Sequence, residues 1–580
     1  MPNPAQESIP LTVPRRRRRP GVWLAVAGIG LFFLAFFLYP AFEILRGGLT
    51  DEQGCLTFAY MAEIFRNPVY LEGLANTAGL AVCTTLLAAL IGVPLAALAS
   101  RHDFPGKKWV TAGILAPMIL PPFVGALGMQ KLLGQYGVLN VLLSKLGVVS
   151  LAAAPDWLGS GGFWAIVAVE ALHLYPIVYL NAVAAFANID PTLHEAAANL
   201  GCTGFRRFRR ITLPLVMPGL FAGLTLVFIW SLTELGTPLM FNYGRATPVQ
   251  IFNGILEMGD NPFPYALVIV LLLASGLLYL LMRFTLGRRA YAMTSRAGTA
   301  AQFRPLRGLR GVAAAAAFGG VFLAAVLPHL AIIGLAFAHG WRDTLLPAAL
   351  TLEHIRNALG HPLAVPSILN SLRYASGALA LALLLGVAIA WLTVRVRVAG
   401  SWLLDSLAML PLAVPGLVLA FGYLAMCQKG RLFAFLDPIA DPTILLVLAY
   451  AVRRLPYVVR AASAGLQQTS VTLEEAGASL GAAPFSVFRR ITLPLIAANL
   501  VAGAVLAFSF AMLEVSDSLL LAQRADYFPI TKAMYELSML LGEGPALAAA
   551  LGCWTMLFLG VSLLAASRLL GKQMGALFRV

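Results

Sequence analysis

The sequence predicts an all-helical integral membrane protein built from two related halves, and three observations lead to this fold class. Of its 580 residues, 59% are hydrophobic and only 12% are charged, against about 25% charged in a typical soluble domain. Twelve apolar stretches are long enough, at roughly 20 residues, to cross a bilayer as helices. The octapeptide Phe-Arg-Arg-Ile-Thr-Leu-Pro-Leu occurs twice, at 208–215 and 488–495. We therefore expect about twelve transmembrane helices in two six-helix repeats.

The apolar stretches are continuous runs rich in Leu and Ala. Strands of a transmembrane barrel would instead alternate apolar and polar residues over about ten positions, so helices are the better interpretation. The stretches lie near residues 22–45, 75–100, 109–130, 163–187, 216–240, 264–286, 311–338, 371–394, 402–426, 442–463, 496–521 and 545–568.

The first stretch follows five consecutive arginines, Arg15 to Arg19. A basic segment before an apolar one is also how a secretory signal peptide begins. This stretch is longer than a signal-peptide core, and no small-residue cleavage site is evident after it. We expect a retained first transmembrane helix, with cleavage as the minor alternative.

The basic residues indicate how the chain is oriented. A net charge of +15 would indicate nucleic acid as a partner of a soluble protein, but in a membrane protein the distribution of Lys and Arg reports topology instead. With both termini in the cytoplasm, most of the 41 Lys and Arg residues lie in the basic tail and the inward loops. The stretch 283–310 alone holds seven Arg. We predict a multi-pass membrane protein with no nucleic-acid partner.

The five cysteines are scattered and show no C-x-x-C spacing, so the sequence predicts neither a disulfide framework nor a metal site. They are Cys55, Cys83, Cys202, Cys427 and Cys553. Cys55 falls in an outward loop, where an inert small residue is the simpler interpretation than a lone reactive thiol.

Matches between the halves extend well beyond the octapeptide. At an offset of 294 residues the matched pairs are Asn76 and Asn370, Arg101 and Arg395, Gly106 and Gly400, Pro121 and Pro415, and Gly128 and Gly422; at 280 they are Pro176 and Pro456, and Glu234 and Glu514. The change of offset places about fourteen extra residues in the outward loop near 134–161 of the first half. Six spans is an even number, so both halves enter the membrane in the same direction. Such parallel repeats place a transport pathway at their interface.

These patterns define the expected domain organisation. A basic cytoplasmic tail covers 1–21, and a basic cytoplasmic linker covers 288–310. The first unit covers 22–287 with its core at 73–287, and the second covers 311–580 with its core at 368–570.

The repeated cytoplasmic element begins with a short helix in each half. Thr192-x-x-Glu195 and Thr472-x-x-Glu475 have the spacing of a capping box, in which the Thr hydroxyl and the Glu carboxylate satisfy backbone donors at the helix start. We expect these Thr residues to be the caps. The acidic side chain also suits the positive end of the helix dipole.

A glycine then separates this helix from a second one. Gly201 and Gly481 fit the left-handed position that ends many helices. The second helix carries the Arg pair, and we expect it to end near Leu213 or Leu493, because the following proline disfavours helical geometry in the residue before it.

The two elements share a pattern: Glu-Ala-Ala, three residues, Gly, nine residues, then Ile-x-Leu-Pro, from Glu195 to Pro214. It resembles the "EAA" loop of binding-protein-dependent ABC importer permeases. The second copy departs only at Gly477, which keeps that position small. The resemblance implies that each loop couples the chain to one of two cytoplasmic ATPase subunits. It assigns the coupling to Glu195, Ala196, Ala197 and Gly201, and to Glu475, Ala476, Gly477 and Gly481.

The same resemblance implies a division of labour. Neither Gly106-Lys107 nor Gly571-Lys572 has the flanking residues of a nucleotide-binding Walker A loop, and the sequence has no nucleophile elbow or zinc-protease motif. We therefore expect a transport subunit and not an enzyme. It would bind no cofactor itself, and its partner would hydrolyse ATP. A periplasmic or extracellular binding protein would deliver the substrate to this subunit, which the resemblance places in the bacterial inner membrane.

Glu234 and Glu514 occupy equivalent places at the end of the span that follows each loop. An acid at the centre of a membrane helix costs about 2.5–3.5 kcal/mol on translocon scales, so something should compensate it. One hypothesis is that the two carboxylates face each other along a cation pathway. The alternative, that each is bonded within its own half and fixes helix packing, carries equal weight.

Other charged residues lie nearby in sequence. His173, Arg453 and Arg454 precede the prolines of two spans, where they could pair with the acids or meet an anion. Glu170 could pair with His173 one helical turn away. We include His173 and Arg453 among the expected pathway residues, and no fixed metal site.

The length and the fused architecture resemble the ferric-iron uptake group of these permeases, and so does the stretch 234–239. Relatives of that group imply thiamine, 2-aminoethylphosphonate or a sugar phosphate as alternative substrates. A secondary transporter without an ATPase is the main alternative class. A membrane-bound scaffold or sensor is less favoured, because we find no extra soluble domain in the sequence.

Overall fold

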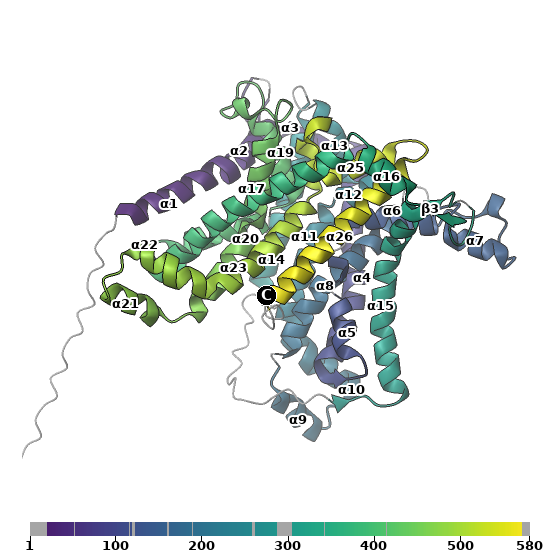
Figure 1. Cartoon of the computed structure of the whole chain (residues 1–580), viewed down its shortest axis with the longest axis horizontal. Coiled ribbons are helices and arrows are strands. Elements are labelled where there is room, and N and C mark those ends of the chain that lie inside the picture. The colour runs from purple at the N-terminus through teal and green to yellow at the C-terminus, as the bar shows by residue number, and fades with distance from the viewer. Residues whose placement is uncertain are drawn as a thin grey trace, which may run out of the picture.

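The computed structural model describes residues 20–286 and 304–570, apart from 52, 115, 119–121, 159–161, 188, 258–260, 342 and 413. Helices make up nearly all of this part of the chain (Figure 1). The strands within it form two short pairs: β1 (His102–Asp103) with β2 (Arg304–Pro305), and β3 (Ala338–His339) with β4 (Ala349–Leu350). The all-helical prediction is confirmed.

The helices follow one another in the order that the repeat predicts. Those of the first half are α1 (Pro20–Phe33), α2 (Tyr39–Leu49), α3 (Ala59–Ile64), α4 (Pro68–Arg101), α5 (Lys107–Gly113), α6 (Pro122–Leu133), α7 (Val138–Lys145), α8 (Phe163–Ala187), α9 (Pro191–Asn199), α10 (Gly204–Arg207), α11 (Leu213–Leu232), α12 (Gly236–Met240), α13 (Thr247–Asn253) and α14 (Phe263–Leu286). Those of the second half are α15 (Leu309–Phe337), α16 (Glu353–Gly360), α17 (Ala364–Ala390), α18 (Ser401–Met409), α19 (Gly416–Met426), α20 (Thr443–Gln468), α21 (Val471–Ser479), α22 (Pro484–Val487), α23 (Leu493–Met512), α24 (Ser516–Leu521), α25 (Ile530–Met539) and α26 (Gly544–Leu570).

Every predicted span contains helix, but the spans are not all uninterrupted. Within the described residues, eight helical segments are long and apolar enough to cross a membrane unaided. A ninth arises if α18 and α19, which meet at an angle of 101°, are counted as one broken span. The remaining predicted stretches are the broken α5–α6 pair, α14, and α20, whose apolar run contains Arg453 and Arg454. Prolines at the α5–α6 and α18–α19 junctions account for the breaks, because proline supplies no backbone N–H to a helix.

The first span of each half packs against the other half. Helix α2 lies against α19, and Tyr423 donates a hydrogen bond to the carbonyl of Phe36 at 2.7 Å. Helix α15 lies against α6 in the equivalent arrangement. Figure 1 shows α1 beside the helices of the second half and α15 beside those of the first. The two halves are therefore interlocked.

Glycines at matched positions allow these crossings. A β-carbon on Gly422 would lie 2.9 Å from the Cβ of Pro40, and one on Gly128 would overlap the carbonyl of Pro328. Gly128 and Gly422 are the residues that the 294-residue offset pairs in the sequence. The repeat thus preserves the small residues at both crossing points.

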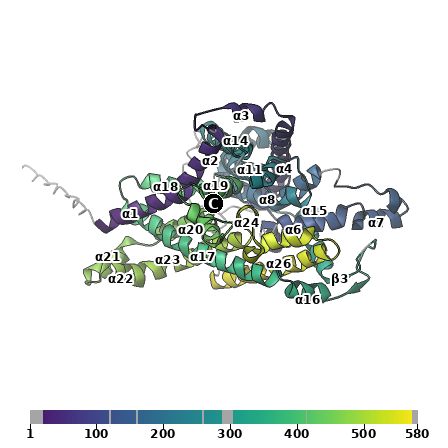
Figure 2. The same ribbon diagram turned by 90° about the horizontal axis from the view of Figure 1, so that it is seen from above.

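The two halves face each other around a central axis. Seen from above, α4, α8 and α11 lie opposite α17, α20 and α23 (Figure 2). The two halves meet at the centre: the Nζ of Lys532 lies 5.7 Å from the ring centroid of Phe252. The same ammonium group pairs with Glu536 at 2.9 Å.

The extra outward residues of the first half carry α7, which projects from the side of the molecule in Figure 1. Asn140 fixes this segment: its side chain donates to the carbonyl of Pro155 at 2.7 Å and accepts from the indole of Trp157 at 2.5 Å. The predicted Arg15–Arg19 cluster and most of the 288–310 linker lie outside the described residues, as does Gly571-Lys572. The unit boundaries stay predictions.

Candidate coupling loops and translocation cavity

The two repeated loops lie apart from each other in Figure 1, α9 and α10 at the bottom of the picture and α21 and α22 at its left. Each contains the two short helices that the sequence predicts, α9 with α10 and α21 with α22. Gly201 has a φ of +72° and Gly481 a φ of +84°. Both values lie in the left-handed region, which confirms the predicted helix-ending role of these glycines.

The predicted capping residues are wrong by two positions. The side chain of Asp190 accepts a hydrogen bond from the backbone N–H of Thr192 at 2.9 Å, and Ser470 does the same for Thr472 at 3.3 Å. Each helix begins directly after these residues, in the first copy with Pro191, a residue that favours the first helical position. Thr192 therefore lies inside the helix. Its N–H and hydroxyl both donate to Asp190, which lowers the pKa of that carboxyl group.

The predicted helix ends at Leu213 and Leu493 are also wrong. In both copies a π-helical turn, Phe208–Thr212 and Phe488–Thr492, joins the loop to the span without a break. A proline ring clashes with the preceding turn of an α-helix, and proline has no backbone N–H to donate. A wider π-helical turn before the proline makes room for the ring and does not require that N–H. The segment Leu34–Leu38 precedes Pro40 in the same way.

The coupling residues form matched surfaces. Glu195, Ala196 and Gly201 are exposed, as are Glu475, Ala476 and Gly481, whereas Ala197 and Gly477 are buried. The small residue allows the helix to pack on its own loop: a β-carbon on Gly477 would lie 2.5 Å from the Cδ1 of Ile491. This close approach accounts for the one departure of the second copy from the pattern.

Large apolar side chains are exposed at equivalent positions of both loops. Leu200 and Leu480 are 86% and 89% exposed, and Phe205 and Phe485 are 76% and 74% exposed. An apolar patch that recurs at the same positions of two loops marks an interaction surface more strongly than one such residue does. The sequence reasoning missed these four residues, although their spacing repeats at 280.

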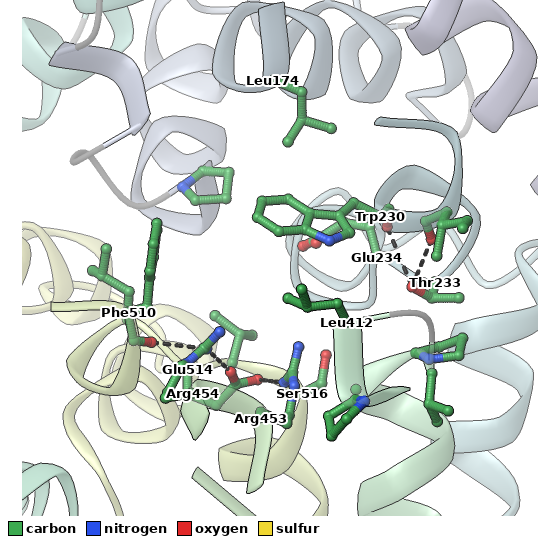
Figure 3. A pocket seen from close by; sticks show the side chains of 18 of the residues that line it. Leu174, Trp230, Thr233, Glu234, Leu412, Arg453, Arg454, Phe510, Glu514 and Ser516 are labelled. Carbon is green, nitrogen blue, oxygen red and sulfur yellow. Dashed lines mark hydrogen bonds and ion pairs between the residues drawn. The ribbon is translucent and has the colours of Figure 1, made fainter. Parts of the chain in front are cut away.

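A cavity of about 160 Å³ lies between the two halves. Its walls include all four predicted pathway residues, Glu234, Glu514, His173 and Arg453, and also Glu170 and Arg454. In Figure 3, Arg453, Arg454 and Glu514 lie together on one side, and Trp230, Thr233 and Glu234 on the other. The structure therefore brings the predicted residues of both halves into one site.

The second half contributes a compensated charge cluster to this cavity. Both Arg453 and Arg454 form ion pairs with Glu514, and Arg453 also pairs with Asp517 at 3.2 Å. Arg454 donates in addition to the carbonyl of Phe510 at 2.9 Å. Two carboxylates thus face two guanidinium groups. On the second-half wall, Glu514 is bonded within its own half, as the second of the two hypotheses describes.

The first half contributes a different wall. Glu234 accepts a hydrogen bond from the backbone N–H of Thr237 at 3.2 Å. Glu170 on α8 is buried and accepts hydrogen bonds from Ser231 and, at 3.3 Å, from Thr84. No Lys or Arg of the described residues forms an ion pair with either acid. Glu170 was not predicted for the pathway; the signal that could have found it is an acid within an apolar span.

His173 contacts the carbonyl of Pro117 through Nδ1 at 2.8 Å. Its pairing with Glu170 stays a prediction. Across the described residues, no group of three or more His, Cys, Asp or Glu side chains is arranged to hold a metal ion. The cavity walls thus differ in their charged residues, with an arginine–carboxylate cluster on the second half and two acids on the first.

Comparison with known proteins decides the family. The model of the family described as "binding-protein-dependent transport system inner membrane component" matches residues 88–290 and 382–572, one segment in each half. The chain belongs to this family. It is a permease with two fused units, and the prediction made from the two loops is confirmed at this level.

Relatives of the permease carry several substrate names. It is 28% identical over 504 residues to a putative ferric transport system permease protein of Haemophilus influenzae, covering 84% of this chain and 76% of that one. It is 27% identical over 513 residues to a ferric transport system permease protein of Actinobacillus pleuropneumoniae, covering 85% and 70%. A probable molybdenum ABC transporter permease protein of Haloferax volcanii is 32% identical over 271 residues, covering 46% of this chain and 91% of that one. The last relative matches about one unit of the permease.

Proposed function

We propose that this inner-membrane permease forms the translocation pathway of an ATP-driven importer, and that the cavity between its halves is part of that pathway. The observation that carries the proposal is the continuity from loop to cavity. The helical segment Gly204–Leu232 ends two residues before Glu234, and Pro484–Met512 ends two residues before Glu514. A displacement of either loop is therefore transmitted along a helix to a cavity wall.

Each loop docks on one cytoplasmic ATPase subunit in this proposal, and ATP is hydrolysed there. Two alike partners account for two alike loops, with the same left-handed glycine and the same exposed Leu and Phe in each. Both loops and both chain termini then lie in the cytoplasm. A separate binding protein delivers the substrate on the opposite side.

Ferric iron is the substrate that the observations favour. Two relatives that align with most of this chain are named for ferric transport. The first-half wall supports the same choice, because carboxylate oxygens suit small, highly charged cations better than soft ligands do. Thiamine, 2-aminoethylphosphonate and sugar phosphates stay alternative predictions.

An oxyanion is the second candidate. One relative is named for molybdenum, and Arg453 and Arg454 both line the cavity. These arginines are already paired with Glu514 and Asp517, which reduces their attraction for an incoming anion. Ferric iron therefore ranks above molybdate.

The test is uptake into proteoliposomes that contain the permease, co-purified with a candidate ATPase and supplied with a loaded binding protein. We expect uptake of radioactive iron that requires ATP and the ATPase, and no uptake of molybdate. Uptake that persists without ATP would instead support a secondary transporter. ATP-dependent uptake of molybdate and not iron would keep the importer and replace the substrate.

A further inference from the structure

The cavity walls differ in charge at positions that the repeat makes equivalent. At the 280-residue offset, His173 and Leu174 correspond to Arg453 and Arg454, and Thr237 corresponds to Asp517. The first half therefore keeps the glutamate of the pair Glu234 and Glu514 but lacks both of the arginines that neutralise it in the second half.

Two acids on the first-half wall are left without a cationic side chain from the described residues. Glu170 is 2% exposed, lines the cavity, and its Oε1 has no hydrogen-bond partner within that part of the chain. Glu234 lines the same cavity, and its hydrogen bonds come from the Thr237 backbone and hydroxyl. The two acids are joined through α11, since Ser231, which donates to Glu170, lies three residues before Glu234.

Buried carboxylates without a partner are costly, because desolvation removes the water that stabilises their charge. The second half meets this cost with arginines. On the first half, the positive charge of a cargo cation would offset the desolvation cost of the two carboxylates, and it would do so only while the cation passes.

We propose that Glu170 and Glu234 form a one-sided transit site for a hard, multivalent cation. Glu514 is not a ligand in this site but a structural member of the neutral cluster. This inference rests on the proposed function in that the cation is the imported cargo. The hydroxyl of Thr233 also lies on this wall. The site would bind its cation weakly enough to release it, because only two carboxylates contribute charge.

Tb³⁺ is a suitable probe, since it is a trivalent cation that prefers oxygen ligands and emits when an adjacent indole is excited. Trp230 lines the same cavity. We would titrate Tb³⁺ into the purified permease–ATPase complex in nanodiscs and record emission excited through tryptophan. We expect saturable emission in the parent protein, displaced by Ga³⁺ and not by molybdate.

Three variants locate the site. Glu170→Gln and Glu234→Gln should each raise the apparent dissociation constant for Tb³⁺ at least about tenfold, as loss of a ligand or its support commonly does, while Glu234→Asp should bind more tightly than Glu234→Gln. Trp230→Phe should abolish the emission, which shows that Tb³⁺ occupies this cavity. A parent protein without saturable emission, emission that survives Trp230→Phe, or affinity unchanged in both Gln variants would overturn the inference.

Iron uptake by the same variants separates this inference from the proposed function. If the parent protein imports iron with ATP and both Gln variants import it at the same rate, the transit site is wrong and the importer stands. If the parent protein imports no iron but binds Tb³⁺ at this wall, the ferric assignment fails and the cation site stands. Melting temperatures of the variants close to that of the parent exclude misfolding as the cause of lost binding.

Discussion

The loops and the cavity walls of the two halves have diverged to very different degrees. The loops share sequence, helix order, a left-handed glycine and exposed apolar residues. The walls share the pair Glu234 and Glu514, but only the second carries arginines against its acid. This difference has a physical reason in the proposed function. Two loops that bind two alike partners are under the same constraint, whereas two walls that enclose a single cargo can divide ligand and structural roles between them.

The largest predicted effect concerns the two equivalent glutamates. Glu514→Gln leaves Arg453 paired with Asp517 alone and removes the ion pair of Arg454, and an uncompensated buried charge costs about 3–5 kcal/mol. Glu234→Gln removes an acid that has no ion pair and should change stability by less than about 1 kcal/mol. Denaturation of the purified variants in detergent measures both. Equal losses at the two positions would show that the walls are electrostatically alike.

The next effect concerns the crossing points of the first spans. Glycine-to-alanine changes within helices usually stabilise by about 0.5–1 kcal/mol. Here we expect the opposite sign, since a β-carbon on Gly128 meets a backbone carbonyl and overpacking costs about 1–3 kcal/mol. Gly422→Ala should cost less, because its β-carbon would lie 2.9 Å from a side-chain carbon of Pro40. Melting temperatures should follow that order. As a control, Gly320→Ala in α15 has open space around it and should not destabilise.

A smaller effect is expected on partner binding. Leu200→Ser and Leu480→Ser remove exposed apolar side chains, so the stability of the permease should not change. Each should weaken ATPase binding by about tenfold to a hundredfold, as removal of a buried Leu from an interface costs roughly 1.5–3 kcal/mol. Binding of the ATPase to immobilised permease is the measurement. Unequal effects of the two changes would mean that the loops are alike in structure but not in use.

The smallest effect distinguishes the two helix caps. The hydrogen bonds from Thr192 lower the pKa of Asp190, so this cap contributes fully at neutral pH and is lost as the pH falls through that lowered value. The hydroxyl of Ser470 does not titrate. Hydrogen exchange of α9 should therefore accelerate, relative to α21, on acidification below about pH 4, near the ordinary Asp pKa. In Asp190→Ser this difference should vanish.

Much of this arrangement could be predicted from sequence because duplication reports equivalence directly. Offsets of 294 and 280 identified the halves, the extra outward segment and the glutamate pair. The caps failed because Thr-x-x-Glu spacing occurs one turn inside a helix as readily as at its start, and Asp190 and Ser470 compete for the same backbone donors. The prediction that the helix ends before Pro214 failed because the chain forms a π-helical turn there, and residue preferences do not predict such a turn.

The charge pairing was beyond sequence reasoning for another reason. Arg453 and Glu514 are 61 positions apart, and only the packing of α20 against α23 and α24 brings them together. From sequence alone, the same arginine was equally suited to an acid or to an anion. The partner of Arg453 could be assigned only from the three-dimensional structure.

The crossed first spans have a mechanical consequence. A body that moves as a unit is set by packing, and here α2 lies on α19 while α15 lies on α6. Each first span also packs on its own half, α2 on α14 and α15 on α26, so during transport it would link the movement of one half to that of the other. Cutting the polypeptide between its repeats would therefore not separate the two halves.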